Sequence, residues 1–372
     1  MTLMGPIRIL IVDDSMVIRK MLSETLSGDL ALEVVGVAGD GRIALSKIPL
    51  LKPDLITLDI EMPVMNGLET LTAIRQLYPK LPVIMFSTLT ERGASATLDA
   101  LALGASDYAS KPSSVGNPST AAERIRTELI PKIKALCGRG LVPSEMASIP
   151  RPIAKTVNQS SSRIDVVAIG ISTGGPNALA EVLPRFAGDF PVPIVLVQHM
   201  PPIYTRLLAE RLSSRSAITV QEGCSGTILT PGHAWIAPGD FHMRVVNTGM
   251  KRCLSLNQAS PENSCRPAVD VLFRSVAASY GANVLGVIMT GMGADGLLGC
   301  QAICEAGGQV IVQDEATSAV WGMPGLVFAS GLSDVALPLD LIAHEISRRV
   351  FQSRNARTLD LKSYAARGAS NS

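Results

Sequence analysis

Apolar and polar positions divide the first third of the chain into short apolar runs and longer amphipathic stretches. The apolar runs cover residues 8–12, 33–38, 55–59, 83–87 and 107–110. Apolar residues recur at helical spacing over 16–26, 42–48, 68–77, 95–103 and 123–136. Five strands that alternate with five helices are typical of a parallel, doubly wound sheet that is covered on both faces.

A second alternation of strands and helices begins at residue 164 and continues to residue 350. It predicts strands at 166–169, 194–198, 218–221, 234–237, 243–246, 284–290 and 310–313. It predicts helices at 177–186, 204–213, 269–280, 297–306 and 339–350. Residues 223–256 carry turn signals and short strands but little helix, which indicates an antiparallel insertion in a mostly parallel α/β domain.

The segments between and after these patterned regions have a different composition. Residues 138–162 are rich in Ser and Pro and lack a hydrophobic period, which is typical of a flexible linker. The last residues are polar, and we expect them to be disordered. The predicted organisation is an N-terminal domain at 1–126, a helix end and linker at 127–163, a second domain at 164–350 and a disordered tail at 351–372.

Composition and charge exclude several classes of protein. The chain has 372 residues, 47% hydrophobic, which is enough to fill two cores, and a net charge of +1, which disfavours a protein that coats nucleic acid. Residues 164–350 hold 15 acidic and 11 basic residues and no helix-turn-helix pattern, which disfavours a DNA-binding output domain. Because the sequence has no apolar stretch of membrane-spanning length and no signal-peptide pattern, we expect a cytoplasmic protein without membrane insertion.

The six cysteines of the chain have no metal-binding spacing and are expected to be buried.

Carboxylates follow two of the predicted strands in the first domain. Asp13 and Asp14 end the first apolar run, and Asp59 ends the third. Because the carboxyl ends of parallel strands line one crevice, these acids converge there and repel one another unless a cation lies between them. Hard oxygen ligands of this kind suit Mg²⁺. Lys111 and Ser87, after the fifth and fourth strands, add a cation and a hydroxyl that can bind phosphoryl oxygens.

These motifs and their order resemble the receiver domain of two-component response regulators. The matching segments are VDDS, DIEMPVMNG, MFST and SKP. The resemblance implies that Asp59 accepts a phosphoryl group from a histidine kinase, and that Ser87 and Lys111 sense it. It also implies a Mg²⁺ site formed by Asp13, Asp14, Asp59 and the backbone carbonyl of Glu61.

A glycine-rich segment, GISTGGP at residues 170–176, lies between an apolar run and a helical pattern. A serine on such a turn is exposed, and the free N–H groups at the following helix start can stabilise an oxyanion. Ser172 is therefore a candidate nucleophile. The turn alone equally fits a phosphate-binding or purely structural loop, although the dinucleotide fingerprint GxGxxG is not matched.

A serine nucleophile needs a base, and the base needs an acid that orients it. His199 ends the strand after the serine helix, so it can face Ser172 across adjacent strand ends. Asp295 lies just beyond the strand at 284–290, on the same rim. Asp270 is the rival acid, but its place in a helical pattern favours a surface cap or ion pair. The remaining histidines are expected to be structural or exposed: His233, His242 and His344.

The second domain resembles the catalytic domain of chemotaxis protein-glutamate methylesterases. The match covers about residues 164–350 and includes IGISTGGP, VQHMPP, PGHAWIAPGDFHM, CRPAVDVLF, GVIMTGMGADG and WGMP. It departs from the family at Ile171, where Ala is usual. The resemblance implies hydrolysis of γ-glutamyl methyl esters on methyl-accepting chemoreceptors, with release of methanol, no cofactor in the esterase site, and deamidation of receptor glutamines by the same machinery.

The resemblance also implies roles for individual residues and a form of control. Thr173 and the backbone N–H of Met292 would support the oxyanion, while the Met292 side chain equally fits core packing. Arg266 could contact an acidic receptor surface or form a structural salt bridge. In the family the unphosphorylated receiver covers the active site, so phosphorylation would shift the population toward an open arrangement. The remaining alternative is a scaffold that reuses the fold without catalysis, which the intact serine, histidine and aspartate disfavour.

Overall fold

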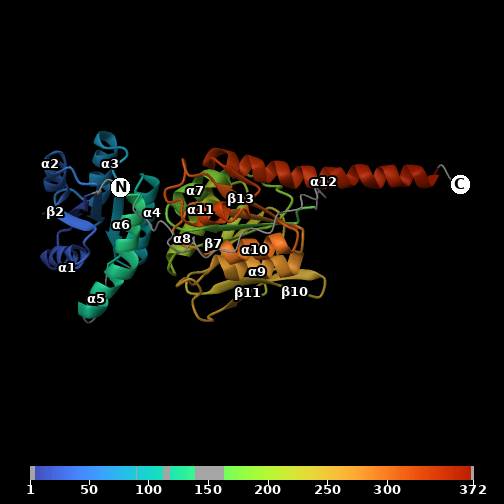
Figure 1. Cartoon of the computed structure of the whole chain (residues 1–372), viewed down its shortest axis with the longest axis horizontal. Helices are drawn as coiled ribbons and strands as arrows, with labels where there is room; N and C mark the ends of the chain where they lie inside the picture. The colour runs from blue at the N-terminus through green and yellow to red at the C-terminus, as the bar shows by residue number, and fades with distance from the viewer. Residues whose placement is uncertain (1–4, 89, 112–117, 139–162, 370–372) are drawn as a thin grey trace. The chain divides into compact units, whose positions relative to one another are not determined.

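The computed structural model describes residues 5–88, 90–111, 118–138 and 163–369. The chain forms two compact units, Met1–Ser144 and Glu145–Ser372, each with its own sheet (Figure 1). Most of the predicted linker, 139–162, lies outside the described residues, so the domain boundaries placed there stay predictions.

The first unit contains a five-stranded sheet in the order β2-β1-β3-β4-β5, in which every pair of neighbours is parallel. Its strands are β1 (Ile7–Val12), β2 (Leu32–Ala38), β3 (Leu55–Asp59), β4 (Val83–Ser87) and β5 (Asp107–Ser110). The central strands are buried along their whole length, as expected for a parallel sheet covered on both faces. This confirms the fold class predicted for the N-terminal domain.

Helices cover both faces of this sheet. They are α1 (Met16–Ser27), α2 (Gly41–Leu51), α3 (Gly67–Leu77), α4 (Glu91–Ala102), α5 (Pro118–Arg124) and α6 (Ile130–Leu136). α4 begins four residues before the predicted start because the Thr90 side chain caps it by accepting a hydrogen bond from the Gly93 N–H. A π-helical turn, Ile125–Leu129, separates α5 from α6. Pro131 lies two residues after this turn, and a proline both lacks an N–H and crowds the preceding turn, which accounts for the widening.

The second unit contains a seven-stranded parallel sheet in the order β14-β13-β12-β6-β7-β9-β8. Its strands are β6 (Val166–Ile171), β7 (Ile194–Gln198), β8 (Thr219–Glu222), β9 (His233–Ile236), β12 (Val284–Ile288), β13 (Gln309–Gln313) and β14 (Val335–Leu337). The antiparallel part is the pair β10 (His242–Thr248) and β11 (Lys251–Asn257). The predicted insertion at 223–256 was therefore too wide, because β9 joins the parallel sheet.

Helices flank the second sheet as well. They are α7 (Gly175–Val182), α8 (Tyr204–Arg215), α9 (Val269–Tyr280), α10 (Leu297–Glu305), α11 (Met323–Ala329) and α12 (Leu339–Ala369). α9 and α10 pack together on one face and α7 contacts α12 on the other, while the β10–β11 hairpin packs on α9 (Figure 1). In the described part of the chain, no helix combines the length and the apolar character that crossing a bilayer requires.

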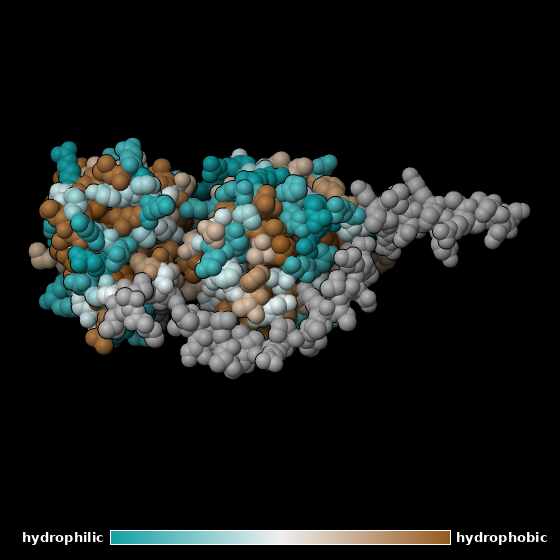
Figure 2. Space-filling view, turned by 45° about the horizontal axis from the view of Figure 1, so that its top comes forward, coloured by the Kyte–Doolittle hydropathy of each residue, from teal (hydrophilic) through white to brown (hydrophobic). Residues whose placement is uncertain are grey.

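The structure differs from the predicted disordered tail over residues 351–369. α12 continues as a helix to Ala369. This stretch contains several Ala, Leu and Arg residues and no proline, so helix propensity outweighs its polar character. Elsewhere on the surface, exposed large hydrophobic residues are scattered over both units, and Figure 2 shows them interspersed with hydrophilic ones.

Candidate functional site

The glycine-rich turn after β6 presents Ser172 at the end of a central strand. The Gly175 N–H donates to the Ser172 carbonyl over 2.8 Å, and Gly174 has φ 77° and ψ −2°. These values match the third position of a type II turn, which requires a residue that tolerates positive φ. Ser172 is partly exposed, and its hydroxyl makes no hydrogen bond with any residue that the structure describes.

Backbone hydrogen bonds place the serine between the two other predicted triad residues. β6 lies between β12 and β7 in the sheet. Beyond the strand ends the ladder continues: the Ser172 N–H donates to the Thr290 carbonyl over 3.0 Å, and the His199 N–H donates to the Ile171 carbonyl over 3.3 Å. His199 and Asp295 meet directly, with 2.8 Å between Nε2 and Oδ2. The structure thus gathers all three at one rim, as the strand-end rule predicted.

Asp295 is buried and held by several donors. Its carboxylate accepts hydrogen bonds from the backbone N–H groups of Val269 (2.7 Å) and Asp270 (2.9 Å), at the start of α9. The Asn263 side-chain amide donates to it over 3.0 Å. Burial alone would raise the pKa of Asp295, but the hydrogen bonds from His199 and from these N–H groups outweigh burial and lower it. Asp295 is therefore an ionised group with a fixed orientation.

The imidazole of His199 has a different partner on each nitrogen. Nε2 faces Asp295, which leaves Nδ1 as the nitrogen that can contact other groups. Cys265 Sγ lies 3.7 Å from Nδ1. Burial lowers the pKa of His199, but hydrogen bonds to Asp295 and Cys265 outweigh it and raise that pKa to about 10. Sequence reasoning missed Cys265, whose spacing to the other cysteines carried no signal.

Asp270 is not the surface residue that the sequence predicted. Its side chain is 1% exposed and accepts hydrogen bonds from the backbone N–H groups of Gly296 (3.0 Å) and Gly299 (2.6 Å). Asn263 Nδ2 donates to Asp270 over 2.9 Å and also to Asp295. Asp270 thus ties the start of α9 to the loop that carries Asp295. The signal was available, because Asp270 interrupts the apolar segment AVDVLF.

The backbone near Ser172 offers several free donors. The N–H groups of Thr173, Gly174 and Met292 have no hydrogen-bond acceptor among the described residues. Gly291 packs directly behind Ser172, since a Cβ built at Gly291 would lie 2.8 Å from the Cβ of Ser172. Glycine at 291 therefore allows the Met292 loop to approach the serine turn closely, and a bulkier residue would push the two apart.

The remaining residues that the sequence singled out have structural contacts. His242 is buried, with Nε2 3.1 Å from the Ser260 carbonyl and Nδ1 3.2 Å from the Ala268 N. Arg266 donates from Nε to Asp240 Oδ1 over 3.0 Å, which supports the salt-bridge alternative. Two further histidines behave as expected: His233 stacks on a tryptophan and His344 is exposed.

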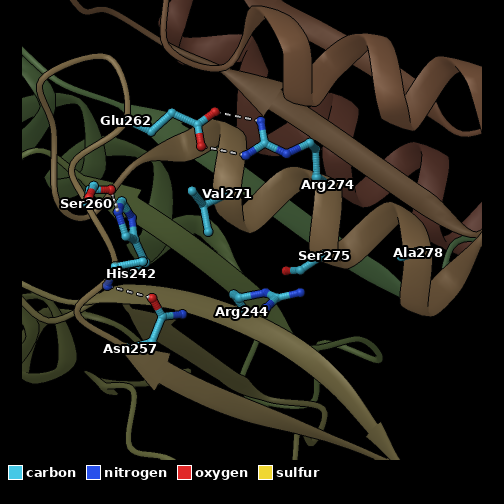
Figure 3. A pocket seen from close by; sticks show the side chains of 10 residues that line it. His242, Arg244, Asn257, Ser260, Glu262, Val271, Arg274, Ser275 and Ala278 are labelled. Atoms are coloured by element: carbon cyan, nitrogen blue, oxygen red, sulfur yellow. Dashed lines mark hydrogen bonds and ion pairs between the residues drawn. The ribbon is translucent and has the colours of Figure 1, made fainter.

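A cavity of about 320 Å³ lies between α9 and the β10–β11 hairpin (Figure 3). It contains the ion pair between Glu262 and Arg274, with 2.6 Å between Oε2 and Nη2. None of the three triad residues lines it. The six cysteines form no disulfide. The prediction that they are buried is confirmed for Cys253 and Cys300, whereas Cys224 is exposed and the other three are partly exposed.

In the first unit, the three predicted acids lie together at the carboxyl edge of the sheet. Asp13, Asp14 and Asp59 each offer an oxygen within 4.8 Å of the others. Lys111 Nζ lies 2.8 Å from Asp13 and 2.7 Å from Asp59. Burial raises the pKa of Asp59 to about 6, because desolvation and the nearby Asp13 outweigh the opposing effect of Lys111. A cluster of carboxylate oxygens fits a hard divalent cation such as Mg²⁺.

The other predicted switch residues border this cluster. Ser87 ends β4, which pairs with β3 and β5, and its hydroxyl donates to the Gly93 carbonyl over 3.3 Å. The exposed Glu61 side chain pairs with Arg92 over 3.5 Å. The Glu61 carboxylate thus lies at the surface, and the role of the Glu61 backbone carbonyl as a metal ligand stays a prediction.

Comparison with known proteins places both units in described families. The family model for the CheB methylesterase matches residues 167–346, and that for the response regulator receiver domain matches residues 9–122. A protein-glutamate methylesterase/protein-glutamine glutaminase from Trichodesmium erythraeum is 54% identical over 355 residues, covering 93% of this chain and 100% of the relative. One of the same description from a Nocardioides species is 48% identical, covering 94% and 97%. The crystal structure of the Thermotoga maritima CheB methylesterase catalytic domain is 41% identical with a TM-score of 0.49, covering 50% of this chain and 98% of that one.

Proposed function

The chain belongs to the CheB methylesterase family, with a response regulator receiver domain in front, and from that premise we propose how its residues carry out the reaction. The family function is the hydrolysis of protein glutamate methyl esters in chemotaxis. The observation that carries our assignment is the gathering of Ser172, His199 and Asp295 at three neighbouring strand ends, with His199 Nε2 2.8 Å from Asp295.

Ser172 acts as the nucleophile on the ester carbonyl of a receptor glutamate. His199 takes the serine proton on Nδ1, because Nε2 is engaged with Asp295. The ionised Asp295 stabilises the imidazolium that forms and keeps the ring in this orientation. His199 then passes the proton to the leaving methoxide, and methanol departs from the acyl-enzyme.

The oxyanion of the tetrahedral intermediate needs donors that are already in place. The free N–H groups of Thr173, Gly174 and Met292 are the candidates on either side of Ser172. Water then attacks the acyl-enzyme, with His199 as the base, and releases the glutamate. A receptor glutamine would react in the same way, with ammonia as the leaving group, and both activities appear in the names of the relatives.

The receiver unit supplies the control. Mg²⁺ would be held by Asp13, Asp14, Asp59 and the Glu61 carbonyl, and when bound it neutralises the charge of an incoming phosphoryl group. Asp59 accepts that group from a histidine kinase. Lys111, which bridges Asp13 and Asp59 in the structure, and Ser87 then contact the phosphoryl oxygens. Phosphorylation shifts the protein toward an active arrangement and raises the esterase rate.

The partners follow from this assignment. The substrates are methyl-accepting chemoreceptors, reached from the cytoplasm, and the phosphodonor is a histidine kinase of the same system. No role for nucleic acid follows from the chemistry of either site. The absence of a membrane-spanning helix among the described residues is compatible with a protein that reaches receptors from the cytoplasm.

The direct test measures methanol release from methylated chemoreceptor membranes. Wild type should release methanol, and Ser172→Ala should reduce the rate by at least about 10³-fold, because the nucleophile is lost. Ser216→Ala, which removes a serine of the same unit outside the site, is the matched control and should keep the wild-type rate. A wild type that releases no methanol would favour the non-catalytic scaffold instead.

A further inference from the structure

Two buried side chains hold the carbonyl groups of the nucleophile turn. Gln198 Nε2 donates to the Ser172 carbonyl over 3.0 Å, and the Thr290 hydroxyl donates to the Thr173 carbonyl over 2.9 Å. Both side chains are 2% exposed. They come from β7 and from the end of β12, the strands on either side of β6. Hydrogen bonds from both neighbouring strands therefore fix the turn.

Peptide planarity gives these contacts a consequence for the opposite side of the turn. In a trans peptide the carbonyl and the following N–H point in opposite directions. Fixing the Ser172 carbonyl thus fixes the Thr173 N–H, and fixing the Thr173 carbonyl fixes the Gly174 N–H. These two N–H groups have no acceptor among the described residues. The hydrogen bonds from Gln198 and Thr290 therefore fix the directions of two free N–H groups. These N–H groups lie on the side of the turn opposite to the two side chains.

Both side chains are themselves held in place. The Thr290 hydroxyl accepts a hydrogen bond from the Val320 N–H over 3.1 Å. Gln198 Nε2 also lies 3.3 Å from the carbonyl of His199, so one amide contacts the backbone of both the nucleophile and the base. Gly175 packs against Gln198 so closely that a Cβ there would lie 1.8 Å from Oε1. The turn, the glutamine and the threonine form a rigid unit.

We propose that Gln198 and Thr290 are positioning residues for the esterase reaction, which orient the Thr173 and Gly174 N–H groups toward the developing oxyanion. The inference rests on the proposed function, since it needs Ser172 to form a tetrahedral intermediate. Neither side chain touches the reacting atoms; each acts through one peptide group. A preorganised donor acts on the transition state more than on the bound ester, so losing its orientation lowers kcat and leaves KM nearly unchanged.

Two variants of Thr290 give the more specific test, because they differ in the presence of the hydroxyl. Thr290→Val keeps the shape but removes the hydroxyl, and it should lower kcat by about 10- to 100-fold. This is less than the ~10²- to 10³-fold seen when an oxyanion donor is lost, because the Gly174 N–H remains and loses only its fixed orientation. Thr290→Ser restores the hydroxyl and should recover most of the rate. Thr205→Val is the matched control, because Thr205 is also buried and its hydroxyl also accepts a hydrogen bond from a backbone N–H, here that of Gly239, while it donates to the Glu222 side chain.

Gln198→Met and Gln198→Glu test the second contact. Met removes the donor at similar volume, whereas Glu replaces it with an oxygen that repels the Ser172 carbonyl. Both should lower kcat, with Glu lowering it further. These variants keep the proposal testable if Thr290→Val does not fold, which its melting temperature would show.

The deciding readout is the affinity of each variant for an alkylboronic acid, which forms a tetrahedral adduct with the serine. If Gln198 and Thr290 orient the oxyanion donors, boronic acid affinity should fall in proportion to kcat, and Thr205→Val should change neither. Normal boronic acid affinity in a slow Thr290→Val, or a wild-type rate in that variant, would overturn the inference while leaving the esterase assignment intact. An inactive wild type would instead overturn the proposed function and the inference together.

Discussion

At the scale of single residues, the two charged groups of the esterase site depend on different kinds of support. Asp295 is held by backbone N–H groups and by Asn263, so its position is set by the loop and by α9. His199 is held by two side chains, Asp295 and Cys265, which both favour its protonated form. The base is therefore the group whose activity should be most sensitive to pH.

The first prediction concerns this pH dependence. A protonated imidazole cannot accept the serine proton, and the pKa of His199 is raised to about 10. The esterase rate should therefore increase as pH rises from neutral toward that value. Cys265→Ala removes one of the groups that raise the pKa, so the rising limb of kcat/KM should move to lower pH. If kcat/KM rises over the same pH range in Cys265→Ala as in wild type, the thiol does not act on His199.

The second prediction concerns Asp270, which sequence reasoning had assigned to the surface. Asp270→Ala leaves the buried N–H groups of Gly296 and Gly299 without their acceptor. This should lower the free energy of unfolding by about 1–3 kcal/mol, measured by urea denaturation. The esterase rate should fall as well, because the same loop carries Asp295. Full activity together with full stability would contradict this role.

At the scale of elements, the sequence predicted the strands better than the short or irregular segments. The strand ends that carry site residues were found because buried parallel strands appear in the sequence as continuous apolar runs. β14, with three residues, and α11, with seven, are too short to show a period. β14 exists because it pairs with β13, a tertiary contact that local pattern cannot reveal.

The sequence predicted those residues of the candidate site that lie near strand ends, but not those that lie in irregular segments. The strand-end rule located Ser172, His199 and Asp295, because each lies within five residues of the end of an apolar run that the pattern defines. Cys265 and Asn263 were missed because they lie in the irregular segment between β11 and α9, where no period fixes their neighbours. Their contacts with His199 and Asp295 arise only from the folded loop.

The third prediction concerns how α12 docks on the sheet. Glu345 Oε1 pairs with Arg349 Nε over 2.7 Å, and Arg349 pairs with Asp334, just before β14, over 2.7 Å. The hydrogen bonds from Arg348 and Arg349 lower the pKa of Glu345 from 4.5 to about 2. Its contribution to stability is thus complete above pH 4.5 and disappears as pH falls toward 2.

Glu345→Gln should therefore destabilise the protein at pH 7 by about 1 kcal/mol, allowing for solvent screening. The difference from wild type should shrink as the pH is lowered through this window. The measurement is urea denaturation of both proteins at several pH values. If the difference in the free energy of unfolding between the two proteins does not change with pH, the charge of Glu345 does not stabilise the position of α12.

At the scale of the whole molecule, two units with separate cores carry two separate chemistries. The receiver unit gathers Asp13, Asp14 and Asp59 with Lys111, and the esterase unit gathers Ser172 with His199 and Asp295. Neither set contains residues of the other unit. The proposed control of one unit by the other therefore requires a change in the arrangement of the chain, driven by the charge that phosphorylation would add at Asp59.

The central claim is that phosphorylation at Asp59 controls the serine esterase in the same chain. The measurement is methanol release from methylated chemoreceptor membranes by wild type and Asp59→Asn, each with and without a small-molecule phosphodonor and Mg²⁺. We expect the phosphodonor to raise the wild-type rate, an excess of chelator to prevent the rise, and Asp59→Asn to keep a basal rate that the phosphodonor does not change. Equal stimulation of wild type and Asp59→Asn would contradict the account.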